Sequence, residues 1–83
     1  MGKLENKTII VAGSTGRIGS KLVQRLLSSG VNVIGLDIDE NSLAKQRQNI
    51  STKDSALFIE ADITSKISLT NALLKAEEKF GSI

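Results

Sequence analysis

Three glycines, spaced three residues apart, are the residues of this 83-residue sequence whose chemistry is easiest to infer. Gly13, Gly16 and Gly19 lie between a β-branched run and an apolar-periodic segment, which is the order strand, turn, helix. Glycines let backbone come close to a ligand, and the following helix directs free N–H groups and the positive end of its dipole at the same point. The pattern therefore suits a bound phosphate, although the spacing alone also fits a plain strand–helix turn.

An acidic residue further along strengthens the phosphate interpretation. A second apolar run, residues 31–37, ends in Asp37. It follows Gly19 by roughly the 20 residues that separate a dinucleotide-binding glycine motif from the carboxylate on the ribose hydroxyl. A solvated strand end is the alternative for Asp37.

The composition argues against several other functions. The sequence contains no cysteine and no histidine, so it lacks a disulfide framework, a thiolate metal site and the usual general base, and we expect no metal site. Basic residues are scattered among acids and there are two aromatics, Phe58 and Phe80, which is unlike a nucleic-acid surface. With neither a signal-peptide pattern nor an apolar run of membrane-spanning length, a cytoplasmic protein without a membrane partner is expected.

Hydrophobic periodicity predicts six alternating elements. They are strands over 7–12, 31–37 and 56–61, and helices over 17–29, 40–49 and about 66–80. Asp39 is the expected N-cap of the middle helix. Alternation of this kind predicts an α/β fold with a parallel sheet, and right-handed crossovers give the strand order 3-2-1. The first two helices should then share one face of the sheet, and the last helix should cover the other.

Apolar residues indicate how two of these elements should pack. The first strand does not alternate, so we expect it to be buried on both faces. The first helix should turn an apolar stripe toward the sheet, formed by Ile18, Leu22, Val23, Leu26 and Leu27.

The glycine motif within Val11–Gly19, Asp37, the pair Asp62-Ile63 and the closing residues 78–83 together resemble the short-chain dehydrogenase/reductase family. The resemblance spans nearly all of residues 7–83 and corresponds to the N-terminal part of a family member. It implies a Rossmann-like, three-layer fold in which residues 1–83 form a partial dinucleotide-binding domain, truncated before the fourth strand.

The resemblance also implies roles in binding NAD. Asp37, with Ile38 beside it, would accept from the adenosine ribose hydroxyls, and Asp62 would contact the adenine amino group with Ile63 packing beside the ring. Asp62-x-Thr64 is also an ordinary helix-start signal. The pyrophosphate turn would comprise Gly13, Ser14, Thr15, Gly16, Arg17, Ile18 and Gly19.

The glycine spacing and the closing segment are similar to different branches of the family. The simpler reductases carry G-x-x-x-G-x-G, whereas residue 17 is Arg here and the pattern is G-x-x-G-x-x-G. That spacing is similar to the extended branch, which modifies sugar nucleotides. The closing segment is more similar to the simpler branch.

The family's catalytic residues have no counterpart in this chain. The resemblance implies that catalysis would need a Tyr-x-x-x-Lys pair and a Ser, and the sequence contains no tyrosine. We therefore predict no catalytic residue and no turnover by the 83 residues alone. The chain is expected to be the cofactor-binding N-terminal part of an NAD-dependent oxidoreductase, with a small-molecule substrate bound only in a longer parent. The alternatives are a non-catalytic nucleotide-binding or interaction module and a fragment of a sugar-nucleotide epimerase or dehydratase.

The first strand also carries a prediction about assembly. The predicted strand order leaves nothing beside it, and an open edge with apolar faces is a template for pairing. We expect the chain either to pair with another copy through the edge near Ile9 and Ile10, or to be an ordered part of a larger molecule.

Overall fold

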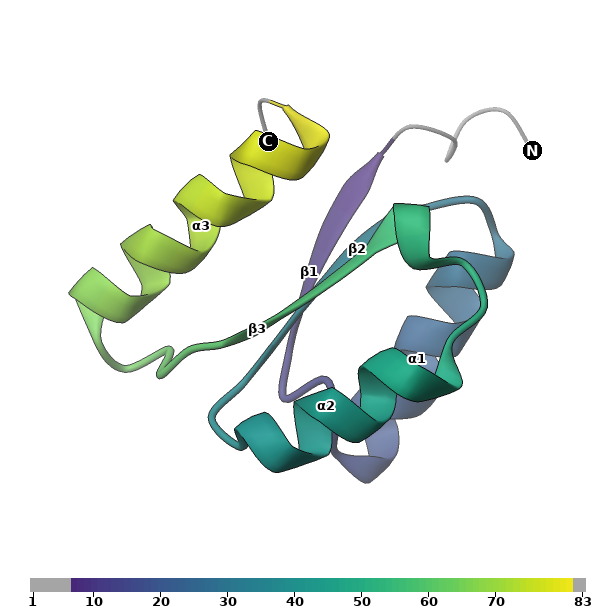
Figure 1. Ribbon diagram of the computed structural model, residues 1–83, viewed down its shortest axis with the longest axis horizontal. Helices are drawn as coiled ribbons and strands as arrows, with labels where there is room; N and C mark the ends of the chain where they lie inside the picture. The colour runs from purple at the N-terminus through teal and green to yellow at the C-terminus, as the bar shows by residue number, and fades with distance from the viewer. Residues whose placement is uncertain (1–6, 82–83) are drawn as a thin grey trace.

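The computed structural model describes residues 7–81, which form three strands, three α-helices and one short 3-10 turn (Figure 1). The predicted elements are all present, with ends within one or two residues of the expected ones. In chain order they are β1 (Thr8–Ala12), α1 (Arg17–Ser28), β2 (Asn32–Asp37), α2 (Glu40–Asn49), the turn η1 (Lys53–Ser55), β3 (Ala56–Glu60) and α3 (Lys66–Phe80). Ser82 and Ile83, part of the closing segment, lie outside the described residues.

The three strands form one parallel sheet in the order β1-β2-β3, which confirms the predicted 3-2-1 arrangement. The register places Ile10 opposite Ile34, and Ile34 opposite Leu57. All three strands run in the same direction, so their carboxyl ends meet at one edge of the sheet.

Helices cover both faces of the sheet, as predicted (Figure 1). Helices α1 and α2 pack on one face over a core of Val11, Val23, Val33, Leu43, Ala56 and Phe58. Helix α3 packs on the other face over a core of Ile34, Leu36, Ile59, Ala61, Ala72 and Ala76. Burial of these apolar side chains is the main favourable term that holds the three layers together.

The expected apolar stripe of α1 is only partly correct. Val23 is fully buried and Leu26 and Leu27 pack against the core, but Ile18 is 82% exposed and Leu22 is 44% exposed. Successive residues of a helix are turned by about 100° from one another, so the face that holds Val23 and Leu27 cannot also hold Ile18 and Leu22. Ile18 and Leu22 thus lie on a second, largely exposed apolar face of α1.

The expectation that β1 is buried on both faces is wrong for the described residues. Val11 is buried toward α1 and α2, but Ile10 on the opposite face is 39% exposed and Ala12 is also exposed. The reason is that α3 packs against β2 and β3, and no strand within residues 7–81 pairs with the outer edge of β1. The sheet therefore has the open apolar edge that the strand order implies.

Candidate cofactor-binding site

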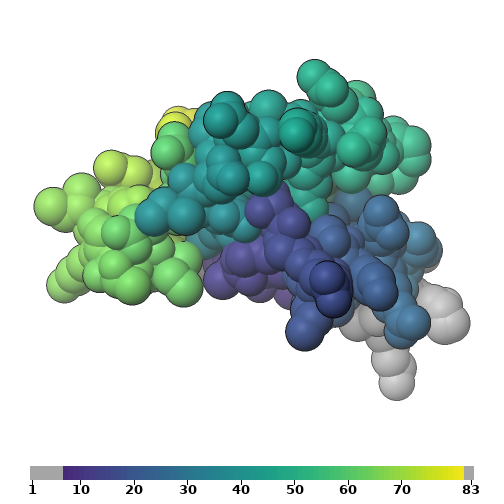
Figure 2. Space-filling model, turned by 90° about the horizontal axis from the view of Figure 1, so that it is seen from below, coloured from purple at the N-terminus to yellow at the C-terminus, as the bar shows by residue number. Residues whose placement is uncertain are grey.

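The predicted site residues gather where the carboxyl ends of the strands meet. Figure 2 looks onto this edge: the turn after β1 lies among the first residues of α1, helix α2 and the loop that leads into α3. In open parallel α/β sheets, ligands bind at this end of the strands. The fold thus brings the glycine-rich turn, the end of β2 and the end of β3 to one surface.

Backbone hydrogen bonds attach the turn to β2. The N–H groups of Gly13 and Ser14 both donate to the carbonyl of Leu36, at 2.7 and 3.2 Å. Gly13 has φ +71°, a conformation that favours glycine, and its carbonyl accepts from the N–H of Gly16 at 3.1 Å. The chain can therefore reverse from strand to helix within four residues.

Gly19 allows α1 to lie directly against this turn. A Cβ atom at position 19 would overlap the carbonyl oxygen of Gly13, lie 2.9 Å from the Gly13 carbonyl carbon and lie 3.2 Å from the Cα of Ser14. A side chain larger than hydrogen would push the helix away from the turn. The third glycine of the motif is thus needed for close packing of backbone on backbone.

The first turn of α1 faces this edge without a capping side chain. Its N-cap is Gly16, and no side chain within residues 7–81 accepts a hydrogen bond there. The first N–H groups of a helix lack partners inside the helix and carry its positive partial charge. They are therefore available to an anion such as a pyrophosphate.

Asp37 is tied to the turn by two hydrogen bonds from one residue. Its Oδ2 accepts from the Thr15 backbone N–H at 3.1 Å and from the Thr15 hydroxyl at 2.6 Å, and its Oδ1 accepts from the N–H of Asp39 at 3.2 Å. Partial burial raises the pKa of Asp37, but these hydrogen bonds outweigh it and hold the pKa below its ordinary value. Asp37 is therefore a fixed, ionised acceptor next to the turn.

Asp62 follows β3 at the same edge but is occupied locally. Its Oδ1 accepts from the backbone N–H and hydroxyl of Thr64, at 2.9 and 2.6 Å. These two hydrogen bonds lower the pKa of Asp62. The N-cap of α3 is Ser65, so Asp62 shapes the loop before the helix without capping it.

Exposed aliphatic side chains accompany the two carboxylates. Ile38 follows Asp37 and is 67% exposed, and Ile63 follows Asp62 and is 54% exposed. Exposed apolar groups next to acceptors at neighbouring strand ends suit a flat, partly apolar group with polar edges.

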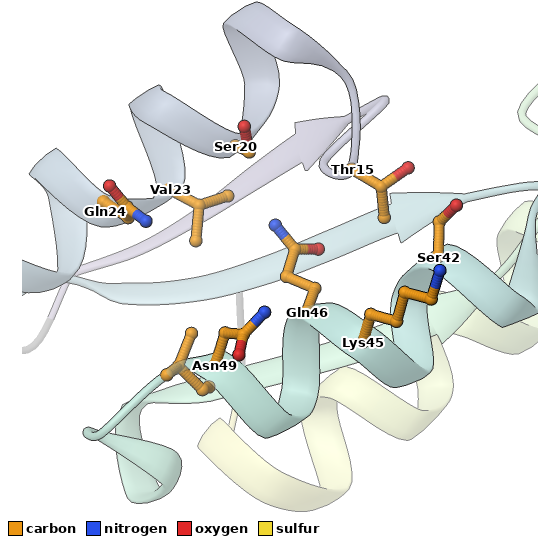
Figure 3. Close-up of a pocket in the computed structure, with 9 residues that line it drawn as sticks. Thr15, Ser20, Val23, Gln24, Ser42, Lys45, Gln46 and Asn49 are labelled. Carbon is orange, nitrogen blue, oxygen red and sulfur yellow. The ribbon is translucent and has the colours of Figure 1, made fainter.

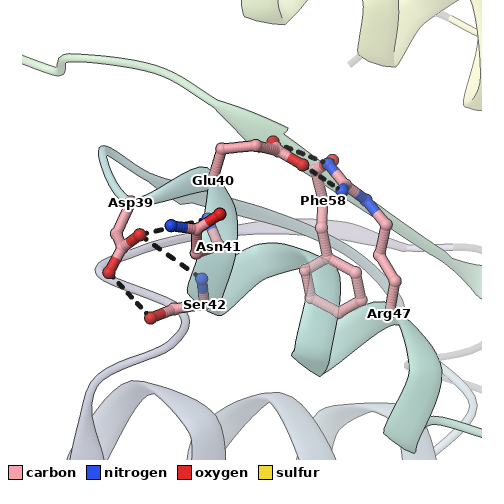
Figure 4. Close-up of polar contacts among 6 residues, drawn as sticks. All are labelled: Asp39, Glu40, Asn41, Ser42, Arg47 and Phe58. Carbon is pink, nitrogen blue, oxygen red and sulfur yellow. Dashed lines mark hydrogen bonds and ion pairs between the residues drawn. The ribbon is translucent and has the colours of Figure 1, made fainter.

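Helix α2 begins at this edge, and polar contacts hold it at its first residues and at Arg47 (Figure 4). Asp39 caps it as predicted, accepting from the N–H groups of Asn41 and Ser42. Arg47 pairs with Glu40 at 2.6 Å and also donates to the carbonyl of Phe58 at 2.6 Å, which ties α2 to β3. The hydrogen bond from Arg47 lowers the pKa of Glu40.

Two contacts of the turn were missed by sequence reasoning. The first is between Gln46 of α2 and Ser14, which are joined by hydrogen bonds. The second is the close approach of Gly35 of β2 to Ser14 and Phe58, since a Cβ atom at position 35 would lie 2.7 Å from both Phe58 Cε1 and Ser14 Oγ. Neither contact follows from a spacing in the sequence, because each joins elements that meet only in the folded chain.

No group of three or more His, Cys, Asp or Glu within residues 7–81 is placed to hold a metal ion. Across the same residues, the helices are too short or too polar to cross a membrane.

Comparison with known families identifies the family of this chain. The family model described as short chain dehydrogenase matches residues 7–83. The chain belongs to the short-chain dehydrogenase family. This confirms the resemblance seen in the sequence, and the sheet topology agrees with it.

Individual proteins are similar to this chain over most of its length. "Post-translational flagellin modification protein A" of Campylobacter coli is 42% identical over 82 residues, 96% of this chain and 32% of that protein. A UDP-glucose 4-epimerase of Mycolicibacterium smegmatis is 41% identical over 54 residues, 65% of this chain and 17% of that protein. The crystal structure of a 3-ketoacyl-(acyl-carrier-protein) reductase from Brucella melitensis complexed with NADH superposes with a TM-score of 0.86 at 28% identity, covering 96% of this chain and 32% of that one. The chain spans about a third of the length of several curated relatives that it matches, among them the Campylobacter coli protein.

Proposed function

We propose that this chain is the NAD-binding N-terminal part of a short-chain dehydrogenase-type oxidoreductase whose catalytic residues lie in a longer parent. In this proposal residues 1–83 are a partial dinucleotide-binding domain. The turn over 13–19 receives the pyrophosphate, Asp37 and Ile38 hold the adenosine ribose, and Asp62 and Ile63 contact the adenine. The expected cytoplasmic location stays a prediction.

The observation that carries the proposal is the pair of hydrogen bonds from Thr15 to Asp37. They fix the strand-end carboxylate beside the glycine-rich turn, and a dinucleotide whose pyrophosphate lies at such a turn places its ribose hydroxyls next to a carboxylate of this kind. The close approach of α1 to the turn at Gly19 supports the same function, because it brings helix N–H groups within reach of a phosphate. The NADH complex of the Brucella melitensis reductase, which shares the fold, is consistent with a nicotinamide dinucleotide.

Asp37 also favours NAD over NADP. A free ribose hydroxyl donates to a carboxylate, whereas a 2′-phosphate brings a second negative charge against it. Like charges in a partly desolvated contact cost several kcal/mol, which corresponds to at least a tenfold preference. Arg17 opposes this by offering a positive charge near the turn, but it does not remove the carboxylate.

Titration of NAD and NADP into the chain by calorimetry tests the proposal. NAD should bind at least tenfold more tightly than NADP, and Asp37→Ala should weaken NAD binding and reduce the preference. Asp54→Ala is the matched control, because Asp54 is an exposed carboxylate on η1 away from the turn. Equal or tighter NADP binding by the unmodified chain would contradict the assignment.

The same preparation should show no turnover of NAD(H) with carbonyl or alcohol substrates, because it has no tyrosine to act as the family's acid–base residue. A hydride transfer that a substitution within residues 1–83 abolishes would show that the catalytic part is not elsewhere.

A sugar-nucleotide epimerase is the second candidate for the parent protein. It is supported by the G-x-x-G-x-x-G spacing and by the 41% identity to the epimerase of Mycolicibacterium smegmatis. Assay of the longer gene product with UDP-glucose and NAD separates the two candidates. An epimerase converts UDP-glucose into an isomer without net formation of NADH. A dehydrogenase leaves UDP-glucose without an isomer and forms NADH from its own alcohol substrate. Cofactor binding without either reaction would favour a non-catalytic nucleotide-binding module.

We also propose that β1 associates with a second copy of the chain through its open edge. Ile10, 39% exposed on this strand, supports the proposal, as does the outer edge that no strand of residues 7–81 covers. Unpaired strand edges with apolar neighbours commonly recruit another strand.

A further inference from the structure

The buried hydroxyl of Ser14 makes a two-way contact with helix α2. Ser14 is fully buried, and its Oγ donates to Gln46 Oε1 at 3.0 Å. In return, Gln46 Nε2 donates to the Ser14 backbone carbonyl at 2.7 Å. The two residues are separated by 32 positions in the sequence, so the contact joins the turn to a distant element.

The chemistry of the two Ser14 groups fixes the orientation of the amide. A backbone carbonyl only accepts, so the amide atom beside it must be the nitrogen, and the oxygen then faces the hydroxyl. Donor and acceptor are thus needed together, in one side chain of this length. Glutamate lacks the donor, and methionine lacks both groups.

The position of Gln46 in the fold shows what this contact supports. Figure 3 shows its side chain extending from α2 toward the turn that carries Thr15, across an open cavity of about 280 Å³ lined by α1 and α2. Helix α2 is itself tied to β3 by Arg47. Gln46 therefore connects the turn to a braced helix.

Backbone bonding within the turn leaves Gln46 a distinct role. Leu36 accepts from the N–H groups of Gly13 and Ser14, Asp37 accepts from that of Thr15, and Gly13 accepts from that of Gly16. The Ser14 carbonyl is satisfied by Gln46. Without that donor the peptide between Ser14 and Thr15 would leave its carbonyl unpaired, and only the hydrogen bond from the Thr15 N–H to Asp37 would hold it.

We propose that Gln46 is a positioning residue for the phosphate-binding turn. Its amide holds the peptide after Ser14 so that the N–H groups at the start of α1 keep the geometry that receives a pyrophosphate. This inference rests on the proposed NAD-binding function. It assigns to α2, through Gln46, a part in setting the shape of the turn.

Gln46→Met tests the inference, because it keeps the size of the side chain and removes both hydrogen bonds. NAD affinity, measured by calorimetry on the 83-residue chain, should fall about tenfold, as expected for two lost hydrogen bonds. Gln46→Glu should lose at least as much affinity, because it removes the donor and places a negative charge behind the anion site. Gln48→Met is the matched control: Gln48 is exposed on the same helix, and its replacement should leave the affinity unchanged within twofold.

Amide hydrogen exchange separates positioning from loss of stability and does not depend on the ligand. In Gln46→Met the amides of Gly13 to Gly16 should exchange about tenfold faster, while those of β2 keep their rates. A uniform increase across the chain, or equal effects of Gln46→Met and Gln48→Met, would overturn the inference. If the unmodified chain binds no NAD, the proposed function fails, and the exchange rates of the turn still decide the role of Gln46.

Discussion

Replacing Gly19 with alanine gives a test in which two physical effects have opposite signs. Gly19 is the third residue of α1, and within a helix alanine is more favourable than glycine by about 1 kcal/mol. If helix propensity alone mattered, Gly19→Ala would stabilise the chain. In this structure the new Cβ meets the backbone of the turn, so we expect the opposite.

The size of the effect follows from the contact distances. The added carbon would lie 2.9 Å from the Gly13 carbonyl carbon, while carbon atoms in contact are normally at least about 3.5 Å apart. This carbon pair alone would require helix and turn to separate by about 0.6 Å, and the overlap with the Gly13 carbonyl oxygen requires more. Overpacking typically costs about 1–3 kcal/mol, so we expect a cost in the upper part of that range, about 2–3 kcal/mol. After the gain in propensity, we expect a net loss of about 1–2 kcal/mol in the free energy of unfolding.

Urea unfolding followed by circular dichroism measures this loss. With a slope near the lower limit for small proteins, about 1 kcal/mol per molar, the midpoint should fall by about 1–2 M. Gly16→Ala is the matched control, because its Cβ would lie 3.3 Å from the Gly13 carbonyl oxygen and φ there is −70°; its midpoint should move by less than half as much. If Gly19→Ala is unfolded in buffer, the same comparison is made in sucrose, which raises stability. A midpoint for Gly19→Ala at or above that of the unmodified chain would refute the close-packing argument.

Two further predictions concern the carboxylate at the turn and the open edge. Since its pKa is lowered in the folded chain, Asp37 contributes stability above its unfolded pKa, near 3.8, and loses it as the pH falls through the folded value. Thr15→Val removes the hydroxyl donor and should raise the pKa of Asp37 in a carbon-13 NMR titration; an unchanged value would mean that the hydroxyl does not stabilise the carboxylate. For the open edge of β1, light scattering on the unmodified chain should show a dimer or larger species. Ile10→Lys should reduce this species to monomer, because a charged side chain at the centre of β1 disfavours pairing. A chain that stays monomeric at high concentration would contradict self-association.

The three layers of the fold and the position of the site at the carboxyl ends of the strands were predictable from sequence, because both depend on local periodicity. Residues 33–36 are a run without polar side chains, which is typical of a central parallel strand, and Asp37 had to lie at its carboxyl end. Ile18 and Leu22 were misplaced because periodicity shows that a residue is apolar but not whether a neighbour covers it. The contact between Ser14 and Gln46 could not be predicted, since it depends on how far α2 lies from the turn. Asp62 carried two interpretations in the sequence, and its two hydrogen bonds from Thr64, both to Oδ1, account for the local one.

Gly35 links the interior of the sheet to the ligand turn in a way that matters for redesign. A substituent there would press on Phe58 and on the buried oxygen of Ser14 at once, so residues 35, 58 and 14 share a single volume. In a library that varies position 35 alone, every side chain larger than hydrogen meets both of these groups. A library that replaces Phe58 with a smaller side chain while enlarging residue 35 moves side-chain volume from β3 to β2. It thereby changes the packing against Ser14 of the turn. The shape of the proposed cofactor-binding turn is therefore open to adjustment from the hydrophobic interior, through residues 35 and 58, which are not part of the turn.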